Sequence, residues 1–535
     1  MSAAARMAVG IVLVFCAQYA WVKPTNFEGY DEWLVLSLAS RGILSHPPAN
    51  RPLAVIFNLP PALLFPHSLS GVYLVHGAYL ALAGVVASLI ALRLLPGQHV
   101  FAFLVGVFTV AWVPSDWIRL ATLYATPYSG LTLALLLAVL LLLESWRMGR
   151  LALLMLAVAV AVVAARCYEG VIPLLACALV FLRFSPGRER LGLWIAVWGG
   201  ALAVILALVM APLVSSTPES MYQRSIFELD PRPGPLLLRL AQQYRYHLAP
   251  VAVVQPAALL VAAVPVSVLV FALAYVLLVR APGVEPPQPR HARGLLRAAA
   301  VGFVAAGLGY APFVLSAKAV AARRTEFFAA PGIAALLAAV CCLATTRVSV
   351  RVARWVPGIL AAWIVGVGSA RTDLMQHFWD ANSYFPRQHA TLSQLTAQAP
   401  QLRPHTLVLL IDQTGGWPAD FSFRHAVEYL YPERAVGHVH GSWPLYYPTA
   451  FTPEGLRVEP WPIIRKAWRA PVDLFRWDEI VAFHLARDGS LHLLTRWPEP
   501  VLPPLPAGAL YDPVSRIDPA AEVPPSRAIL RSGGG

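Results

Sequence analysis

The chain has 535 residues, of which 58% are hydrophobic and only 13% are charged. Water-soluble proteins carry about 25% charged and roughly 45–50% apolar residues, so both values depart in the direction of a membrane protein. This composition excludes a disordered or collagen-like chain. It also excludes a chain that wraps nucleic acid, so the net charge of +13 has to be interpreted by its position along the sequence.

Eleven stretches free of Asp, Glu, Lys and Arg are candidates for membrane crossing, because a helix needs about 20 apolar residues to cross the hydrocarbon core. They lie within residues 6–23, 51–93, 93–116, 119–144, 150–166, 169–183, 190–219, 245–280, 297–318, 326–347 and 354–371. The first stretch is interpreted as a signal anchor rather than a cleaved signal peptide, because Gln18 and Ala20 make a poor cleavage site.

Arginines in alternate connections orient these stretches. They cluster in residues 147–150, 183–190, 280–297 and 347–354. Short cytoplasmic loops collect Arg and Lys, so these four connections are assigned to the cytoplasm. The sequence therefore predicts a polytopic α-helical protein of a bacterial-type inner membrane, with eleven transmembrane helices, a cytoplasmic N-terminus and an extracytoplasmic C-terminus.

The predicted domains follow from where the apolar stretches end. Residues 1–370 form a transmembrane domain with a first external loop at 23–70, residues 371–499 form a small extracytoplasmic α/β domain, and the Pro/Gly-rich tail at 500–535 is expected to be loosely ordered. Within the soluble domain we expect a helix inside 373–402 and a buried strand at 406–411. Residues 479–486 and 491–496 are expected to pair as strands.

The first external loop carries an unusual acidic segment. Glu28, Asp31 and Glu32 place three carboxylates within five residues, just after the first apolar stretch. Acidic residues near a membrane are costly unless they serve a purpose. One interpretation is an acidic cap on an interfacial helix, where Asp and Glu complement the helix dipole. The other is a carboxylate that takes a proton from an acceptor hydroxyl or binds a divalent cation.

The segment Tyr30-Asp31-Glu32-Trp33, with Ala39, Gly42 and Asn50-Arg51-Pro52-Leu53 after it, resembles the first external loop of the GT-C superfamily of membrane glycosyltransferases. Its protein-mannosyltransferase and aminoarabinose-transferase branches are the most similar. The resemblance implies a GT-C-like fold over residues 1–370 and a sugar donor carried on a polyprenyl phosphate. It makes Asp31 the catalytic base with Glu32 beside it, and it places Glu28 and Arg51 among the substrate contacts. Arg-Pro-Leu stands where two prolines are commoner, so the subfamily stays open.

A second feature is the hairpin around Arg166, Tyr168 and Glu169. The apolar stretches on either side hold only 15 and 13 residues, so these side chains are expected to lie below the outer membrane surface. An arginine at that depth is suited to a phosphate, which its fork of donors can bind. We therefore assign Arg166 to the donor phosphate and Tyr168 and Glu169 to the substrate. The alternative is that Arg166 and Glu169 simply pair with each other.

A third feature is the positive charge on the predicted external side at Lys318, Arg323 and Arg324. This charge runs against the usual orientation rule, which favours a functional role. The segment is similar to the Arg-Tyr-x-x-Pro stretch that opens a late helix in many GT-C proteins, although Glu326 and Phe327 interrupt the pattern. The resemblance makes these three residues donor-phosphate contacts. Loop solvation and attraction to anionic lipid are the alternatives.

Other motifs give weaker signals. Asp116-Trp117-Ile118-Arg119 with Tyr124 is suited to a sugar contact, but aromatic residues at an interface usually anchor helices, and that interpretation is preferred. His438 and His440 lack further ligands for a metal site. Gly415-Gly416 lacks the spacing of a nucleotide loop.

The leading functional hypothesis is a glycosyltransferase that moves a sugar from a polyprenyl-phosphate donor to a glycan, lipid or protein acceptor of the cell envelope, with inversion at the anomeric centre. Arginines would stabilise the departing phosphate. No cofactor is certain, a divalent cation such as Mg or Mn is compatible, and no metal ligands or nucleic-acid partner are assigned. The alternatives are a lipid-linked glycan flippase or transporter, a polysaccharide polymerase or ligase, and a non-catalytic envelope assembly protein.

Overall fold

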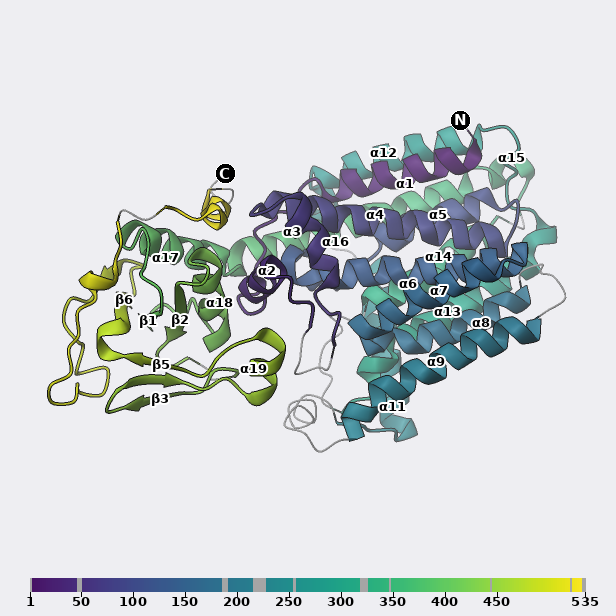
Figure 1. The fold of residues 1–535 in the computed structure, drawn as a ribbon. Coiled ribbons are helices and arrows are strands. Elements are labelled where there is room, and N and C mark those ends of the chain that lie inside the picture. Colours follow the sequence, from purple (N-terminus) through teal and green to yellow (C-terminus); the bar gives the residue numbers. More distant parts are fainter. Residues whose placement is uncertain are drawn as a thin grey trace. The chain divides into compact units, whose positions relative to one another are not determined.

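A computed structural model describes residues 2–45, 51–184, 191–214, 228–253, 256–317, 326–345, 348–442, 445–519 and 522–531. The chain divides into two compact units. Unit 1 comprises Met1–Lys23, His76–Leu120 and Pro127–Phe378, and unit 2 comprises Pro24–Val75, Ala121–Thr126 and Trp379–Gly535. Unit 1 is helical, whereas unit 2 contains all the strands of the described chain (Figure 1).

Each of the eleven charge-free stretches contains an apolar helix. These are α1 (Ala3–Tyr19), α4 (Leu69–Leu94), α5 (His99–Ala111), α6 (Thr122–Met148), α7 (Leu151–Cys167), α8 (Ile172–Phe184), α9 (Leu191–Val214), α12 (Ala263–Val279), α13 (Ala292–Val314), α14 (Glu326–Leu343) and α16 (Val356–Asn382). Over the described ranges, 6 helices are long and apolar enough to cross a membrane, and the other apolar helices are shorter. The helical membrane architecture agrees with the sequence, while the number of crossings and their orientation stay predictions.

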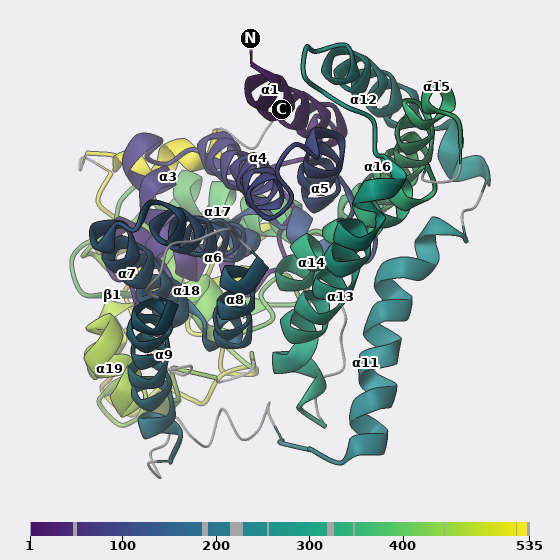
Figure 2. The ribbon, with the colours of Figure 1, turned by 90° about the vertical axis from the view of Figure 1, so that its right-hand side faces the viewer.

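Helix α11 (Pro233–Leu248) was not expected from the sequence, which assigned this region to a long loop. It runs along α13 (Figure 2). The ring of Tyr244 stacks on Phe303 of α13 with 4.4 Å between centroids. The Tyr244 hydroxyl donates a hydrogen bond to the Phe303 carbonyl. The Tyr244 contacts thus hold one face of this helix against α13, while Leu237 and Leu238 remain exposed.

Helices α13 and α14 lie side by side because small residues let their backbones approach (Figure 2). A Cβ atom added to Gly302 of α13 would lie 2.6 Å from the carbonyl oxygen of Gly332 on α14. A Cβ added to Gly309 would lie 2.7 Å from the backbone nitrogen of Ala329. Close packing of this kind replaces the hydrophobic driving force that helices lack inside lipid. The interface fixes α14, whose first residue is Glu326.

Unit 2 contains two sheets. The larger has the strand order β2-β1-β6-β7, in which β1 (Thr406–Asp412) pairs in parallel with β2 (Ala435–Val439) and β6 (Ile480–Leu485). Strand β7 (Leu491–Leu493) pairs antiparallel with β6, as the sequence predicted for this hairpin. The smaller sheet is antiparallel, with β3 (Thr449–Thr452), β4 (Gly455–Val458) and β5 (Asp473–Arg476) in order. The predicted buried strand at 406–411 is therefore the centre of the larger sheet.

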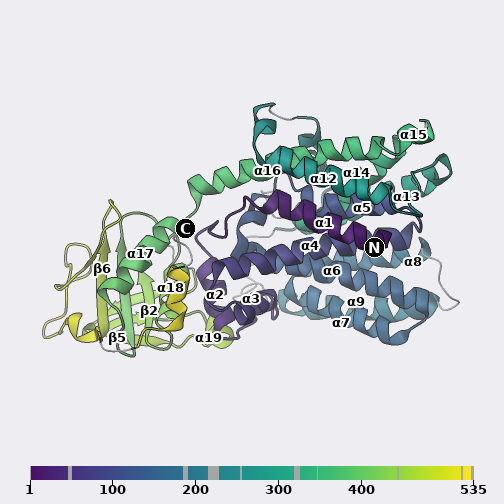
Figure 3. The same cartoon turned by 90° about the horizontal axis from the view of Figure 1, so that it is seen from above.

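The segment that the sequence predicts to be the first external loop shares one hydrophobic core with the C-terminal sheet. Helices α17 (Phe385–Gln398) and α18 (Asp420–Leu430) lie on the larger sheet (Figure 3). Phe27 and Trp33, which flank the acidic segment, are buried in the same cluster as Leu392 and Leu410. Helix α2 (Glu32–Ser40) packs on α18, and the short α3 (Leu59–Leu64) follows it. The sequence had placed this loop with the transmembrane domain, whereas the compact units place residues 24–75 with residues 379–535.

The Pro-rich C-terminal segment packs on unit 2, although the sequence favoured loose order. Ile529 is 1% exposed within the core, and the guanidinium of Arg527 lies 4.7 Å from the centroid of the Tyr431 ring. Ile517 forms a β-bridge with Leu402. Apolar side chains spaced between the prolines supply this anchoring. Residues 532–535 lie outside the described residues.

Gly302→Ala is expected to destabilise the protein, because the added methyl would overlap the Gly332 carbonyl on α14. Overpacking of this kind costs about 1–3 kcal/mol. Thermal unfolding of the purified protein in detergent measures the effect. The matched control is Gly200→Ala on α9, where nothing lies within 4 Å of the added Cβ. Equal melting temperatures for the two variants would contradict the close α13–α14 contact.

Candidate functional site

The acidic segment of the first loop is held in a tight turn at Gly29. This glycine has φ +94°, a backbone conformation that side chains rarely allow. A Cβ atom at this position would also lie 2.5 Å from Cγ of Tyr384. The turn places Asp31 and Glu32 at the start of α2. Glycine is therefore required both for the backbone angle and for the close approach of the Tyr384 ring.

Glu32 is buried inside this turn. Its side chain is 0% exposed, and its carboxylate accepts hydrogen bonds from the backbone N–H groups of Glu28 and Gly29, the second at 3.1 Å. Burial, with a smaller contribution from the neighbouring Glu28 carboxylate, raises the pKa of Glu32 to about 8, although backbone hydrogen bonds act in the opposite direction. A carboxyl group in this position shapes the loop around Asp31.

Gln388 of α17 connects the turn to the C-terminal part of unit 2. Its Oε1 accepts a hydrogen bond from the Trp33 indole at 2.9 Å. Its Nε2 donates to the carbonyl oxygens of Gly29 at 3.2 Å and Gly416 at 3.1 Å. The side chain is fully buried, so each of these groups would lose a partner if Gln388 were removed.

Asp31 differs from Glu32 in its surroundings. It occupies the N-cap position of α2, yet its side chain accepts no hydrogen bond from the N–H groups of the first helical turn. It is half-buried rather than enclosed, as are Glu28 and Arg51 of the same unit. Asp31 therefore makes no capping hydrogen bond, although Asp31 and Glu32 both lie at the start of α2, where acidic residues complement the helix dipole.

A second polar cluster lies in unit 1, where the α5–α6 connection meets the start of α14. Asp116 is 0% exposed and Glu326 is 1% exposed. The Glu326 Oε2 atom accepts a hydrogen bond from the backbone N–H of Ser115 at 3.2 Å, and Asp116 and Arg119 both act on it electrostatically. The Glu326 Oε1 atom has no hydrogen-bond partner in the described chain. Two acidic side chains are thus buried beside one arginine.

Arg119 is fixed at the centre of this cluster. It is 3% exposed, and its Nη2 donates to the carbonyl oxygens of Thr109 and Val110, each at 3.4 Å. Its guanidinium lies 5.7 Å from the centroid of the Phe327 ring. The imidazole of His76 lies beside it, with Nε2 3.2 Å from the Arg119 carbonyl oxygen. The guanidinium is a buried cation that acts electrostatically on Glu326.

The predicted hairpin contributes Tyr168 to the same end of α14. The ring of Tyr168 stacks on Phe328 with 5.6 Å between centroids, and it lies 5.8 Å from the ring of Tyr128. Glu169 begins the 3₁₀ turn that follows Tyr168. Arg166 donates a hydrogen bond to the carbonyl of Leu208 on α9 at 3.3 Å. Tyr168 therefore contacts the first turn of α14, which begins at Glu326. The Arg166 guanidinium instead contacts α9.

The remaining predicted phosphate contacts, Lys318, Arg323 and Arg324, lie outside the described residues. Within the described ranges, no group of three or more His, Cys, Asp and Glu residues is arranged to hold a metal ion. The Asp116 and Glu326 carboxylates are nevertheless oxygen ligands of the kind that Mg²⁺ prefers.

From the sequence alone, Asp116 and Arg119 were expected mainly to anchor a helix at the interface, and Glu326 was interpreted as an interruption of a motif. The available signal was their position, since all three are charged residues at the ends of apolar stretches on the same predicted side. Ionisable residues at such positions are functional candidates by default. Their contact depends on tertiary packing of α5, α13 and α14, which sequence periodicity does not specify.

No known protein family matches the sequence, and no curated protein sequence matches it. A search of solved structures finds a likeness to the crystal structure of ArnT from Cupriavidus metallidurans bound to undecaprenyl phosphate. The two chains are 15% identical, with a TM-score of 0.39, and the match covers 81% of this chain and 88% of that one.

Glu32→Gln is expected to change how stability depends on pH. The folded protein holds a proton on Glu32 up to about pH 8, whereas the unfolded chain releases it near the ordinary value of 4.5. Stability contributed by this group is therefore present at low pH and is lost as pH rises through this window. Gln does not titrate, so this fall should disappear, although its amide cannot accept from both N–H groups.

Chemical denaturation between pH 4.5 and 8 measures this change. The control is Glu454→Gln, an exposed carboxylate in the turn between β3 and β4. A slope in the Glu32→Gln variant as steep as in the parent protein would contradict a buried, protonated Glu32.

Arg119→Leu is expected to destabilise unit 1 by about 1–3 kcal/mol, because the Thr109 and Val110 carbonyls lose a buried donor and Glu326 loses a neighbouring cation. Adding Glu326→Gln to that variant should restore part of the loss, since the acid on which Arg119 acts is then removed. Thermal unfolding in detergent measures both variants. Arg147→Leu, at an exposed position of α6, serves as the control. A melting temperature for Arg119→Leu equal to that of the control would rule out the proposed compensation.

Proposed function

We propose that this chain is a GT-C-like glycosyltransferase of a bacterial inner membrane. It would transfer a sugar from a polyprenyl-phosphate donor to an acceptor of the cell envelope on the extracytoplasmic face. The observation that carries the proposal is the preformed turn at Gly29, which buries Glu32 and keeps the Asp31 side chain from capping α2. The resemblance of this segment to the first loop of GT-C enzymes supports the same assignment.

In the proposed reaction Asp31 is the catalytic base. A hydroxyl of the acceptor loses its proton to the Asp31 carboxylate as its oxygen bonds to the anomeric carbon of the sugar. The bond from that carbon to the phosphate oxygen breaks, and the polyprenyl phosphate departs from the opposite side, which inverts the centre. A positioned base typically contributes 10²- to 10⁴-fold to such a step.

The neighbours of Asp31 have positioning and binding roles in this proposal. Glu32 and Gln388 hold the turn through buried hydrogen bonds. Glu28 and Arg51 are proposed to contact the substrate. Because Glu32 is fully buried, we assign it to positioning.

The departing phosphate needs positive charge, because its negative charge develops as the sugar leaves. We propose that Arg166, Lys318, Arg323 and Arg324 supply it, with Tyr168 and Glu169 contacting the sugar. The buried pair of Asp116 and Glu326 is proposed to support this region of unit 1 through Arg119 and the start of α14. Asp116 and Glu326 would also be the oxygen donors for a divalent cation.

Asp31→Asn is expected to lower transfer from a lipid-linked sugar by about 10²-fold or more, because the amide cannot take the proton. Membranes containing the full chain and a radiolabelled polyprenyl-phosphate sugar provide the assay. The turn does not depend on hydrogen bonds from the Asp31 side chain to α2, so expression and melting temperature should stay unchanged.

Glu454→Gln again serves as the control, because it removes an exposed carboxylate of unit 2 remote from the turn in sequence. Undiminished transfer by Asp31→Asn at normal expression would remove the assignment of Asp31 as base. Loss of transfer in both variants would show that the assay responds to the charge of unit 2 rather than to this residue.

A further inference from the structure

Unit 2 contains a cavity of about 900 Å³, lined by both apolar and charged residues, that the proposed reaction does not use. Helix α2, the end of α18, the first residues of β1 and the strand β5 border it. The volume lies within the range of small-molecule sites, which is about 300–1,000 Å³. Every residue of its lining belongs to unit 2, so the cavity is a property of this unit alone.

The lining has an unusual backbone. Across the described ranges, the only residues other than glycine with positive φ are His67, His405, Glu433 and Arg469, with φ of 64°, 58°, 61° and 53°. All four border this one cavity. Left-handed backbone is unfavourable for residues with a Cβ atom, and such strain clusters at sites where a side chain must point in a particular direction. The four side chains are all ionisable, which favours a binding role.

Arg469 gives the clearest example of this strain. It is the C-cap of α19 (Pro462–Trp468) and adopts the left-handed conformation. Helices commonly end on a glycine in this conformation, because glycine has no Cβ to clash. The Arg469 side chain is exposed and has no ion pair or hydrogen bond to the rest of the described chain. Its position at the cavity wall therefore brings an available guanidinium to the site.

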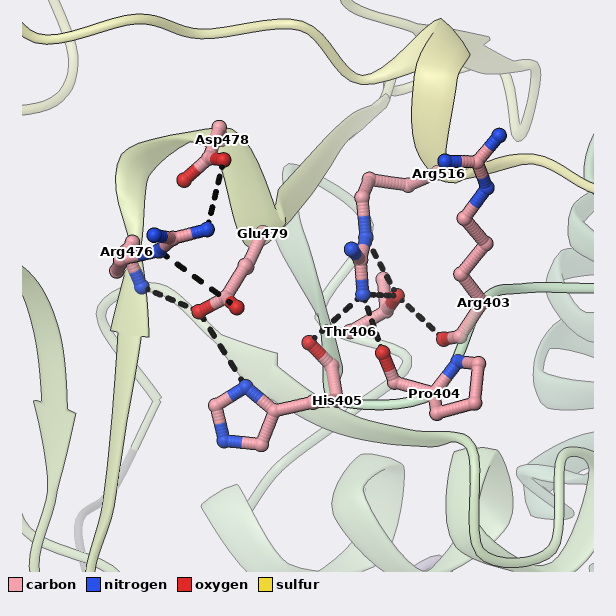
Figure 4. A network of polar contacts seen from close by, with 8 residues as sticks. All are labelled: Arg403, Pro404, His405, Thr406, Arg476, Asp478, Glu479 and Arg516. Carbon is pink, nitrogen blue, oxygen red and sulfur yellow. Dashed lines mark hydrogen bonds and ion pairs between the residues drawn. The ribbon is translucent and has the colours of Figure 1, made fainter.

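A network of polar contacts holds the part of the cavity wall that is formed by the segment before β1 (Figure 4). Arg516 donates hydrogen bonds to the carbonyl of His405 at 3.0 Å and to the hydroxyl of Thr406 at 2.9 Å. The His405 imidazole lies 3.3 Å from Glu479 and stacks on Phe475 of β5, with 4.7 Å between centroids. These contacts fix the strained segment before β1 and hold its histidine beside β5.

The charges at the base of the cavity are already compensated. Glu428 of α18 lies 3.0 Å from Arg424 and 2.8 Å from His425, and Arg424 also lies 3.8 Å from Asp473. Burial alone would raise the pKa of Glu428, but His425 and Arg424 outweigh it and hold the pKa at about 2. Glu428 and Asp473 are therefore satisfied within the protein and contribute little net attraction for a cation.

Two guanidinium groups have N–H donors for a ligand. Arg41 follows α2 and is 38% exposed. Its Nε donates to the Ser37 carbonyl at 3.3 Å and its Nη2 lies 3.7 Å from Glu428, which leaves further N–H groups for a ligand. Arg469 has no partner in the described chain. Arginine binds carboxylate and phosphate groups through two parallel hydrogen bonds. Ser37, Ser40 and the unpaired carboxylate of Glu433 add groups that bind hydroxyls. Neighbouring cations and hydroxyl-binding groups suit a ligand that carries both an anion and several hydroxyls.

We propose that this cavity binds an acidic saccharide, whose carboxylate or phosphate is held by Arg41 and Arg469 and whose hydroxyls contact Ser37, Ser40 and Glu433. The binding site stands on unit 2 alone and does not depend on whether the chain transfers sugar. The two tests are therefore independent. If the cavity does not bind a saccharide, the transfer assay with Asp31→Asn still tests the proposed enzyme activity.

Isothermal titration of the full chain in detergent tests the proposal with digalacturonic acid, glucose 6-phosphate, maltose and inorganic phosphate as probes. At least one acidic saccharide should bind about tenfold more tightly than maltose and than phosphate, because charged hydrogen bonds and hydroxyl contacts both contribute. The double variant Arg41→Ala with Arg469→Ala should lose about tenfold or more of that affinity. Arg465→Ala, in the same helix α19 but outside the cavity lining, should bind as the parent does.

Arg469→Gly separates binding from folding. Glycine relieves the left-handed strain at the end of α19, so the melting temperature should rise or stay the same while affinity for the acidic saccharide falls. Unchanged affinity in this variant would overturn the role of Arg469. Equal binding of maltose, or no binding of either acidic saccharide at millimolar concentration, would overturn the proposal itself. Tighter binding of inorganic phosphate than of both saccharides would show an adventitious ion only.

Discussion

The hydrogen bonds of Gln388 are the interaction on which the conformation of the first loop depends. One buried amide from α17 satisfies the Trp33 indole and the Gly29 carbonyl, which flank Asp31 on both sides. A buried polar group left without a partner costs about 1–3 kcal/mol, so the turn and the C-terminal residues of unit 2 stabilise each other. The loop that resembles a catalytic segment therefore depends on residues more than 350 positions away.

Much of the fold could be predicted from the sequence, because its dominant signals are local. Runs without charge located every apolar helix. A continuous apolar run located β1, and a turn between two strand-like segments located the pairing of β6 with β7. The tail after residue 500 was expected to be loosely ordered because of its proline content. Ile517 and Ile529 instead reach the sheet and the core through specific packing, which composition does not report.

The candidate site was predicted less completely, for a physical reason. Asp31 and Glu32 are adjacent in sequence and were given similar roles, but one turn of backbone buries Glu32 and leaves Asp31 half-exposed. Asp116 and Glu326 are 210 positions apart, and the packing of α14 against α5 and α13 brings them near each other in unit 1. Contacts of this kind are set by helix packing, and a single sequence carries no direct record of them.

The buried charges of the two units have different consequences. In unit 1, Asp116 and Glu326 share Arg119, so the cluster tolerates little change without losing its compensation. In unit 2, Arg424 compensates Glu428 and Asp473 beneath the cavity and thereby leaves Arg41 and Arg469 available at its wall. The same residue type therefore stabilises the interior in one place and prepares a surface for an anion in the other. Burial and the number of carboxylates per arginine decide which role applies.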